Sequence, residues 1–373
     1  MQTDALLTEL DQEIRRSLDT LKLPGAALAM IEGGEIVATR TYGYADVASS
    51  RAVTEDTRFS VQSISKSFAA WGVMTLVEDR RLDLDRPVDD YLKRWRLPPA
   101  SFDRRLVTPR RLLSHHAGIS TSGFPGITAE FPDVTLIDGL NGDLPALTGD
   151  QEAYWRRWDL SMDWPASIAY PPGEGWRYSN AGFGILELMV EDITGSSFAR
   201  FMQTRVLEPL GLRHSTYEPG STDDVALPYG EDGGARVQLR YLSHAAAGLY
   251  ATIGDLAAFA CAALGQSGTP GRGVLRGSSL AAMFTPHGLA DRTPEIQFEA
   301  GLGHLLLAHD GLLNVHHSGG SIGWRSVFSI YPSVGAGLCI LVNSDGGNPL
   351  WQPVVRRWRN AIQTRWTDRV SLQ

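Results

Sequence analysis

A serine and a lysine three positions apart, Ser63 and Lys66, stand at the start of a stretch rich in helix formers. The apolar residues that follow recur at helical spacing as far as Leu82, which predicts a helix that begins at or near Ser63. Residues three apart share one face of a helix, so the Lys66 amine can reach the Ser63 hydroxyl. Free N–H groups at the helix start can stabilise negative charge beside the serine. A desolvated lysine can take the proton of a serine at neutral pH and so activate it as a nucleophile.

The Ser-x-x-Lys pattern is common and in most proteins has no chemical role. The composition of the chain favours a catalytic role for Lys66, because the chain uses arginine at almost every position where it has a positive charge. Only three of its 34 Lys and Arg residues are lysines, namely Lys22, Lys66 and Lys93. Lys66 has the least polar neighbours of the three, Ile64 and Phe68. An arginine cannot give up its proton in a protein, whereas a lysine can.

A second candidate group lies in the segment Tyr178-Ser179-Asn180, after a loop rich in Pro and Gly and before a predicted helix. Such a loop can present a phenol and an amide into a cleft. A lysine ammonium beside Tyr178 would lower the pKa of the phenol, which could then act as general base and afterwards as general acid. Taken alone, these residues also fit an ordinary polar loop.

A glycine-rich segment at the end of a predicted strand comprises His317, Ser318, Gly319 and Gly320. Glycines there let a substrate approach the backbone closely and expose N–H donors for an oxyanion. The segment runs into a Gly-x-Ser-x-Gly pattern centred on Ser321, which is the pattern of the nucleophile elbow in α/β-hydrolases. That elbow needs a helix directly after the serine, whereas residues 324–331 alternate like a strand. We therefore interpret Ser321 as a residue without a catalytic role.

Metal and cofactor signals are weak in this sequence. His115 and His116 are adjacent, but neighbouring loop residues tend to point apart and no Cys, Asp or Glu cluster accompanies them. We interpret both as hydrogen-bonded loop histidines and expect no metal. No phosphate loop or dinucleotide fingerprint occurs, so we expect no cofactor. Cys261 and Cys339 lie far apart in apolar contexts, which is typical of buried free thiols.

Composition sets further bounds on function. With 373 residues, 43% hydrophobic and 20% charged, the chain resembles an ordinary globular protein. A net charge of -8 argues against nucleic acid and against anionic membrane surfaces as partners. The start is acidic and amphipathic, so we expect no secretory signal in the sequence as given. Asp255 and several glycines interrupt the most apolar stretch, 244–264, so we expect no transmembrane helix. A cytoplasmic enzyme fits these features, and the sequence carries no signal for an oligomeric state.

Strand and helix patterns predict the architecture. Strand-like runs cover 26–31, 36–41, 305–308, 313–317, 326–331 and 337–343, the last four as an antiparallel meander. Helical patterns cover 3–21, 109–114, 181–193, 198–210, 256–264 and 350–366. We therefore expect an α/β (α+β) fold in which residues 1–82 and 287–373 form an antiparallel sheet domain flanked by terminal helices. A mainly helical domain, 83–286, is inserted between them, and its aromatic-rich segment 120–172 is expected to form a pocket wall or lid.

The three motifs, in this order, resemble the serine β-lactamase and penicillin-binding protein superfamily, on the branch of class C-like esterases, D-aminopeptidases and acyltransferases. Segments at 57–59, 112–118, 208–212 and 247–252 are similar to the family too, and the resemblance covers about residues 20 to 345. It implies the β-lactamase/transpeptidase-like fold. It also implies that Ser63 attacks a carbonyl, that Lys66 and Tyr178 manage its proton, and that Asn180 orients the substrate.

The resemblance further implies that the backbone N–H groups of Ser63 and Gly320 form an oxyanion hole. His317 stands where penicillin-recognising members carry the lysine of Lys-Thr-Gly, and Ser318 takes the place of the threonine. A histidine is mostly neutral at pH 7 and anchors a carboxylate less well than a lysine. No match is found for the glutamate that class A enzymes use for deacylation. The histidine at 317 lowers the expectation of β-lactamase or cell-wall peptidase activity, and the expected lack of a secretory signal lowers it again.

Three functions remain open on the sequence. The first is hydrolysis of a small carboxylic ester or amide through an acyl-enzyme on Ser63, with a small-molecule acyl substrate as the partner. The second is transfer of the acyl group to an amine or alcohol, as biosynthetic members of the family do. The third is a binding protein without catalysis, against which the intact set of Ser63, Lys66 and Tyr178 speaks.

Overall fold

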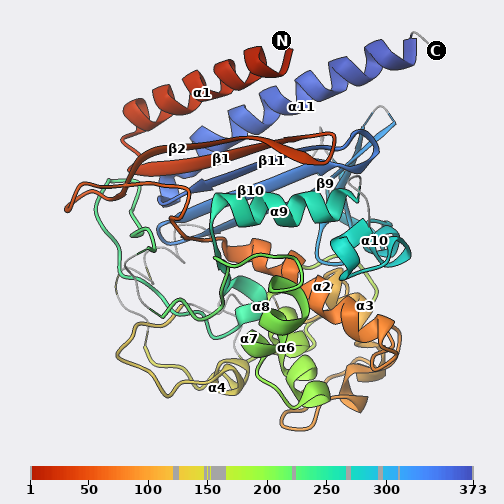
Figure 1. Cartoon of the computed structure of the whole chain (residues 1–373). Helices are drawn as coiled ribbons and strands as arrows, with labels where there is room; N and C mark the ends of the chain where they lie inside the picture. Colours follow the sequence, from red (N-terminus) through yellow and green to blue (C-terminus); the bar gives the residue numbers. More distant parts are fainter. Residues whose placement is uncertain are drawn as a thin grey trace.

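A nine-stranded antiparallel sheet forms the middle layer of the computed structural model, which describes residues 2–120, 126–146, 149, 152, 165–220, 224–265, 270–292, 297–309 and 311–371 (Figure 1). The strand order is β3-β2-β1-β11-β10-β9-β8-β7-β6. The strands are β1 (Gly25–Glu32), β2 (Glu35–Asp46), β3 (Arg51–Ala52), β6 (Leu289–Arg292), β7 (Gln297–Ala300), β8 (Leu305–His309), β9 (Leu312–Ser321), β10 (Trp324–Tyr331) and β11 (Ala336–Val342).

Both ends of the chain build this sheet, because β1 pairs antiparallel with β11, with Leu28 opposite Ile340. Helices α1 (Gln2–Leu21) and α11 (Asn348–Ser371) lie side by side across one face of the sheet (Figure 1). The leucine stripe of α1 points inward, and Leu10 is fully buried with Ile340 in the same apolar cluster. Apolar residues recur about every 3.6 positions along a helix and every second position along a strand. The terminal helices and the sheet therefore bury their apolar faces against one another.

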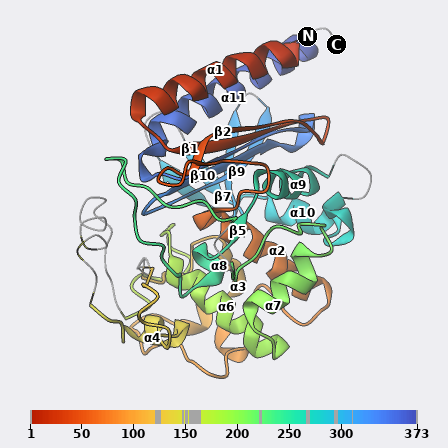
Figure 2. The same cartoon turned by 60° about the vertical axis from the view of Figure 1, so that its left-hand side comes forward.

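The opposite face of the sheet carries α9 (Ile253–Leu264), beyond which lie the remaining helices (Figure 2). They are α2 (Ser65–Glu78), α3 (Pro109–Leu113), α4 (Leu136–Asn141), α6 (Asn180–Thr194), α7 (Phe198–Met202), α8 (His244–Ala247) and α10 (Gly277–Met283). A single apolar cluster runs from the sheet through α9 into α2 and α6. In it the rings of Phe68 and Phe259 stack with centroids 3.7 Å apart. Burying one such side chain contributes about 1.5–3 kcal/mol.

The antiparallel sheet with terminal helices confirms the fold class predicted from the sequence. Each strand run and helix pattern named above coincides with an element, but several bounds differ. Helix α2 ends at Glu78, not at Leu82, and the pattern at 198–210 is divided into α7 and a π-helical turn, Gln203–Leu207. Strands β6 and β7 were not expected from the sequence. Both cysteines are free and buried, as predicted.

The division of the chain into domains at 82 and 286 stays a prediction. Helix α9 falls within the predicted helical domain, 83–286. It nevertheless packs directly on β1, β10 and β11 of the predicted sheet domain. Much of the aromatic-rich segment 120–172, with Phe124, Tyr154, Trp155, Trp158 and Trp164, lies outside the described residues. The interpretation of that segment as a pocket wall or lid is therefore untested.

Candidate active site

The chain reaches Ser63 through a short strand and a tight turn. Strand β4 (Phe59–Ser60) pairs with β5 (Tyr250–Ala251), and the N–H of Val61 donates to the carbonyl of Leu249 at 3.0 Å. Gln62 then adopts a left-handed φ of 52°, which is rare for a residue with a Cβ and costs about 1–3 kcal/mol. Ser63 lies in the 3₁₀ turn Gln62–Ile64, which continues directly into α2. The predicted position of Ser63 at a helix start is thus what the structure has.

Lys66 lies in the first turn of α2 and is fully buried. Its Nζ is 3.1 Å from Ser63 Oγ and donates a hydrogen bond to the carbonyl oxygen of Ala246 at 2.7 Å. Burial lowers the pKa of Lys66 well below its usual range. A neutral amine keeps a lone pair, so it can accept the proton of Ser63.

Tyr178 comes from the loop before α6, and its ring centroid lies 4.9 Å from Lys66 Nζ. Burial raises its pKa above the ordinary value, although a side-chain hydrogen bond with Ser63 acts in the opposite direction. The sequence-based expectation of a lowered pKa at Tyr178 is therefore wrong in sign. It assumed a lysine ammonium beside the phenol, whereas the same burial that neutralises Lys66 keeps Tyr178 protonated.

Helix α6 begins at Asn180 directly after Tyr178. The hydroxyl of Ser179 caps this helix by accepting the N–H of Gly182 at 2.9 Å, and it donates to the carbonyl of Ser120 at 2.8 Å. Asn180 is half-buried as the first helical residue. The cap therefore holds Tyr178 and Asn180 at a defined helix start.

The carbonyl that holds Lys66 is itself positioned by α6. Glu187 of α6 is only 3% exposed and accepts the N–H of Ala245 in α8 at 2.8 Å. Its other oxygen lies 3.3 Å from Nδ1 of His244. Burial alone would lower the pKa of His244, but its bond to Glu187 and the charge of that carboxylate raise it. The bonds fix the short helix α8, and with it the carbonyl of Ala246.

His317 lies on β9 and is 4% exposed. Its Nδ1 donates to the carbonyl of Ser318 at 2.7 Å. Burial is the main cause that lowers the pKa of His317 to about 3, and a proton on Lys66 would act in the same direction. The imidazole is therefore neutral at pH 7, as its residue type led us to expect.

The end of β9 presents an open strand edge toward the serine turn. Pairing with β8 stops at His316, which lies opposite Leu305, whereas pairing with β10 continues through Gly320 to Ser321. Gly319 packs directly against the turn, because a Cβ there would overlap the carbonyl oxygen of Val61 and lie 2.9 Å from the Cβ of Gln62. Gly320 is exposed at this edge. The structure therefore brings the glycine motif next to Ser63.

Ser321 ends β9, and only two residues separate it from β10. Its Oγ accepts a hydrogen bond from the hydroxyl of Tyr241 at 2.8 Å. A strand follows where a nucleophile elbow would have a helix, so the interpretation of Ser321 as a residue outside the reaction agrees with its surroundings.

His115 is a hydrogen-bonded loop histidine, as the sequence analysis predicted, but its contact with Tyr178 was not foreseen. Its ring lies against that of Tyr178, with centroids 4.4 Å apart, and its Nδ1 accepts the N–H of Ser179 at 3.1 Å. His116 instead bonds through Nδ1 to the carbonyl of Ser114 at 2.8 Å, as expected for a loop histidine. The segment 112–118 was among those that resembled the family, and that was the only signal available.

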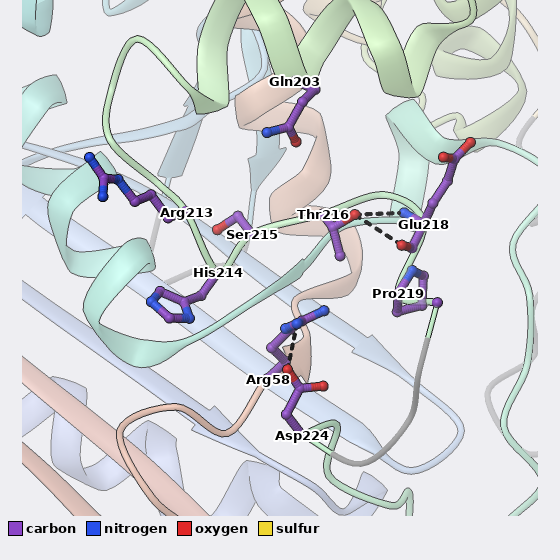
Figure 3. Close-up of a pocket in the computed structure, with 10 residues that line it drawn as sticks. Arg58, Gln203, Arg213, His214, Ser215, Thr216, Glu218, Pro219 and Asp224 are labelled. Atoms are coloured by element: carbon purple, nitrogen blue, oxygen red, sulfur yellow. Dashed lines mark hydrogen bonds and ion pairs between the residues drawn. The ribbon is translucent and has the colours of Figure 1, made fainter.

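A separate cavity of about 600 Å³ opens beside Arg58, away from these groups (Figure 3). Arg58 and Asp224 point toward each other there and form an ion pair. The Thr216 hydroxyl bonds to the backbone of Glu218 at 3.0 and 3.1 Å. Among the described residues that line it there is no lysine and no tyrosine. The described lining of this cavity therefore lacks the lysine and tyrosine that lie beside Ser63.

A metal site and a membrane-spanning helix are the remaining features to consider in the described part of the chain. No group of three or more His, Cys, Asp and Glu side chains is placed to hold a metal ion within those residues. Among the helices described, none combines the length and the apolar character that a membrane crossing requires.

A buried lysine bonded to a serine at a helix start, with a tyrosine beside both, on this three-layer fold, defines the class of β-lactamase-fold serine hydrolases. A family model described as Beta-lactamase matches residues 10–362. The chain belongs to the beta-lactamase family.

Individual relatives span several activities. Esterase EstB of Burkholderia gladioli is 30% identical over 236 residues, which are 63% of this chain and 58% of the esterase. Penicillin-binding protein 4* of Bacillus subtilis (strain 168) is 31% identical over 214 residues, which are 55% of this chain and 42% of that protein. The chain thus spans about half the length of the curated relatives it matches.

Solved structures agree on the fold. The octameric penicillin-binding protein homologue from Pyrococcus abyssi is 27% identical with a TM-score of 0.72, over 91% of this chain and 74% of that one. A class C beta-lactamase has a TM-score of 0.73 at 19% identity, over 96% of each chain, and supports the fold alone.

Proposed function

We propose that this protein hydrolyses uncharged carboxylic esters or small amides through an acyl-enzyme on Ser63. The observation that carries the proposal is the 3.1 Å approach of Lys66 Nζ to Ser63 Oγ, at a lysine whose pKa burial lowers and whose neutral form burial favours. A serine hydroxyl needs an adjacent base before it can attack a carbonyl, and Lys66 is suited to that task. Similarity to an esterase supports the choice of substrate class.

In the acylation step Lys66 takes the proton of Ser63, and Oγ forms a bond to the carbonyl carbon. The C=O electron pair moves to oxygen, where the backbone N–H groups of Ser63 and Gly320 are proposed to stabilise it. The neutral Tyr178 then donates its proton to the leaving oxygen or nitrogen as the tetrahedral intermediate collapses. Tyr178 regains a proton from the Lys66 ammonium, so the proton of Ser63 ends on the leaving group. Water repeats the sequence on the ester of Ser63 and releases the acid.

The electrostatics favour a substrate without a carboxylate beside the reacting carbonyl. The neutral His317 supplies no positive charge at the end of β9, where a lysine in the penicillin-recognising members is a permanent cation. A substrate carboxylate would therefore lose its water shell here without a charged partner. Asn180, at the start of α6, is proposed to bond the amide or ester of the substrate.

The test compares p-nitrophenyl esters with nitrocefin, with and without an amine acceptor, on the unaltered protein and on Ser63→Ala. Ester turnover that Ser63→Ala abolishes, together with slow nitrocefin turnover, is the expected result. His317→Lys should raise turnover of carboxylate-bearing substrates relative to neutral ones. Efficient nitrocefin hydrolysis by the unaltered protein would contradict the substrate class. Acyl transfer to the amine that outpaces hydrolysis would identify an acyltransferase instead.

A further inference from the structure

His115 holds Tyr178 from three directions. The imidazole lies against the phenol ring, with centroids 4.4 Å apart and an interplanar angle of 31°. The backbone carbonyl of His115 accepts the N–H of Arg177 at 2.8 Å. Its ring Nδ1 accepts the N–H of Ser179 at 3.1 Å. The residues immediately before and after Tyr178 are thus both bonded to His115.

The backbone of His115 makes this arrangement possible. His115 follows α3 in a left-handed conformation with φ of 59°, and its own N–H donates to Leu112 at 3.2 Å. The left-handed turn directs both the carbonyl and the side chain toward the tyrosine loop. Residues with a Cβ rarely adopt this φ, and they persist in it where the surrounding structure compensates the cost.

The charge state of His115 matters as well. Because Nδ1 accepts from Ser179, the ring hydrogen lies on Nε2 and the imidazole is neutral. Burial lowers the pKa of His115 well below its usual range. A proton on Lys66, His317 or His116, which face it from α2, β9 and its own loop, would lower this pKa further. A protonated ring would turn an N–H toward the N–H of Ser179 and break the bond.

We propose that His115 is a positioning residue for Tyr178: its ring and Nδ1 keep the phenol directed at Ser63 and Lys66. Tyr178 precedes the cap residue of α6 and lies in a loop, so contacts outside the helix are needed to direct its ring. A displacement of 1 Å in such a group can reduce a rate by about 10²-fold. This inference rests on the proposed acyl-enzyme function, because it acts through the proton transfers assigned to Tyr178.

Two variants separate the contributions without straining the backbone. Glycine accepts a positive φ freely, so His115→Gly removes the ring and the acceptor together. Asparagine also tolerates this conformation and its Oδ1 can accept the N–H of Ser179, so His115→Asn restores the acceptor alone. His116→Asn is the matched control, because the ring of His116 bonds to Ser114 and not to the tyrosine loop.

The readouts are the rate of Ser63 labelling by a fluorophosphonate probe, kcat and KM on p-nitrophenyl acetate, and thermal melting. We expect His115→Gly to slow labelling by about 10²-fold, with kcat lowered and KM little changed. His115→Asn should recover part of the loss, and His116→Asn should label at close to the normal rate. Melting curves identify any loss that comes from unfolding.

A double-mutant cycle decides between positioning and general structural support. If His115 acts through Tyr178, then His115→Asn should cost little further rate in a Tyr178→Phe background. An equal fold-loss in both backgrounds, or a normal labelling rate for His115→Gly, would overturn the proposal. Failure of the unaltered protein to label at Ser63 would instead overturn the proposed function. The His115→Asn arm alone completes the cycle if His115→Gly does not fold.

Discussion

The hydroxyl of Ser326 donates a hydrogen bond to the carbonyl oxygen of Val61, 2.7 Å away, although the two residues are 265 positions apart in the chain. Ser326 lies on β10 opposite Gly319 of β9. Val61 directly precedes the turn that carries Ser63, the proposed nucleophile. The bond therefore ties the serine turn to the strand edge at which the oxyanion would be stabilised.

The close contact of Gly319 with this turn predicts the effect of adding a methyl group. Gly319→Ala should lower the free energy of unfolding by about 1–3 kcal/mol and slow Ser63 labelling, because the Cβ would overlap Val61 and Ser326. Gly254→Ala is the control: nothing but the Thr252 hydroxyl lies within 4.0 Å of its Cβ, and it stands in a helix. That change should stabilise the protein by about 0.5–1 kcal/mol. Equal behaviour of the two variants in denaturant melts would contradict the packing argument.

The identity of the nucleophile is tested by a pair of serine variants. Ser63→Ala should abolish ester turnover and labelling by fluorophosphonate or penicillin-type probes, whereas Ser321→Ala should keep most of both. Ser321 lies in a strand hairpin, and its Oγ accepts a hydrogen bond from Tyr241. Mass spectrometry of the labelled peptide gives the answer. A label on Ser321, or one that persists in Ser63→Ala, would show that the nucleophile lies elsewhere.

The buried Lys66 predicts how the rate depends on pH. Catalysis needs the neutral amine, so acylation should rise with pH through an apparent pKa that lies below the ordinary lysine value. Lys66→Arg should lose about 10²- to 10⁴-fold in acylation rate, since a guanidinium cannot accept the proton. Lys66→Met, which is similar in length and uncharged, controls for packing. An unchanged pH profile in Lys66→Arg would rule out Lys66 as the base.

Tyr178 and Lys66 serve the same proton transfers, so their losses should not multiply. Tyr178→Phe keeps the ring over Lys66 Nζ and removes only the hydroxyl, so the protein should fold while acylation falls steeply. The double variant Lys66→Arg, Tyr178→Phe should be little slower than the slower single variant. Single-turnover acylation rates for the three variants provide the comparison. Fully multiplicative losses would mean that the two residues act independently.

Buried histidines predict a loss of stability in mild acid. Burial lowers the pKa of His304 to about 4, although its bond to the carbonyl of Leu302 opposes the shift. The unfolded chain binds this proton near pH 6.5 and the folded protein does not, so stability falls as pH drops below 6.5 and the loss ends near 4.

Urea melts at pH 7, 6 and 5 measure this effect. Each such histidine should cost about 1.4 kcal/mol per pH unit in that window. His304→Asn, which can still donate to Leu302, should reduce the slope by that amount, whereas His214→Asn at an exposed side chain is the control. Identical slopes for the unaltered protein and His304→Asn would contradict the shift.

Local patterns were sufficient to predict most of the elements. The alternation at 326–331 and the apolar run at 337–343 correspond to β10 and β11, and the stripe at 3–21 corresponds to α1. Strands β6 and β7 could not be found in this way. Each has only four residues, the lower limit for a recognisable strand pattern. They form an edge hairpin because β7 pairs with β8 and β6 pairs with β7.

In the candidate site, too, sequence spacing predicts contacts within one helical turn but not contacts between distant parts of the chain. Spacing alone placed Lys66 beside Ser63, because both lie in one helical turn. The pKa of Tyr178 could not be predicted from its neighbours, because burial, which depends on the whole fold, outweighs the nearby groups. The contact of His115 with the tyrosine loop was missed because the bond to Ser179 joins residues 64 positions apart through a left-handed turn that no pattern indicates.

The pairing of β1 with β11 has a consequence for biosynthesis. Ser63 and Lys66 leave the ribosome early, but the strands that complete the sheet, and the glycine edge beside the serine, are among the last to emerge. A nascent chain that lacks β9 to β11 has the nucleophile and its base without the surface against which they pack. If Ser63 reacts as proposed, its reactivity should therefore arise only once translation has passed Val342.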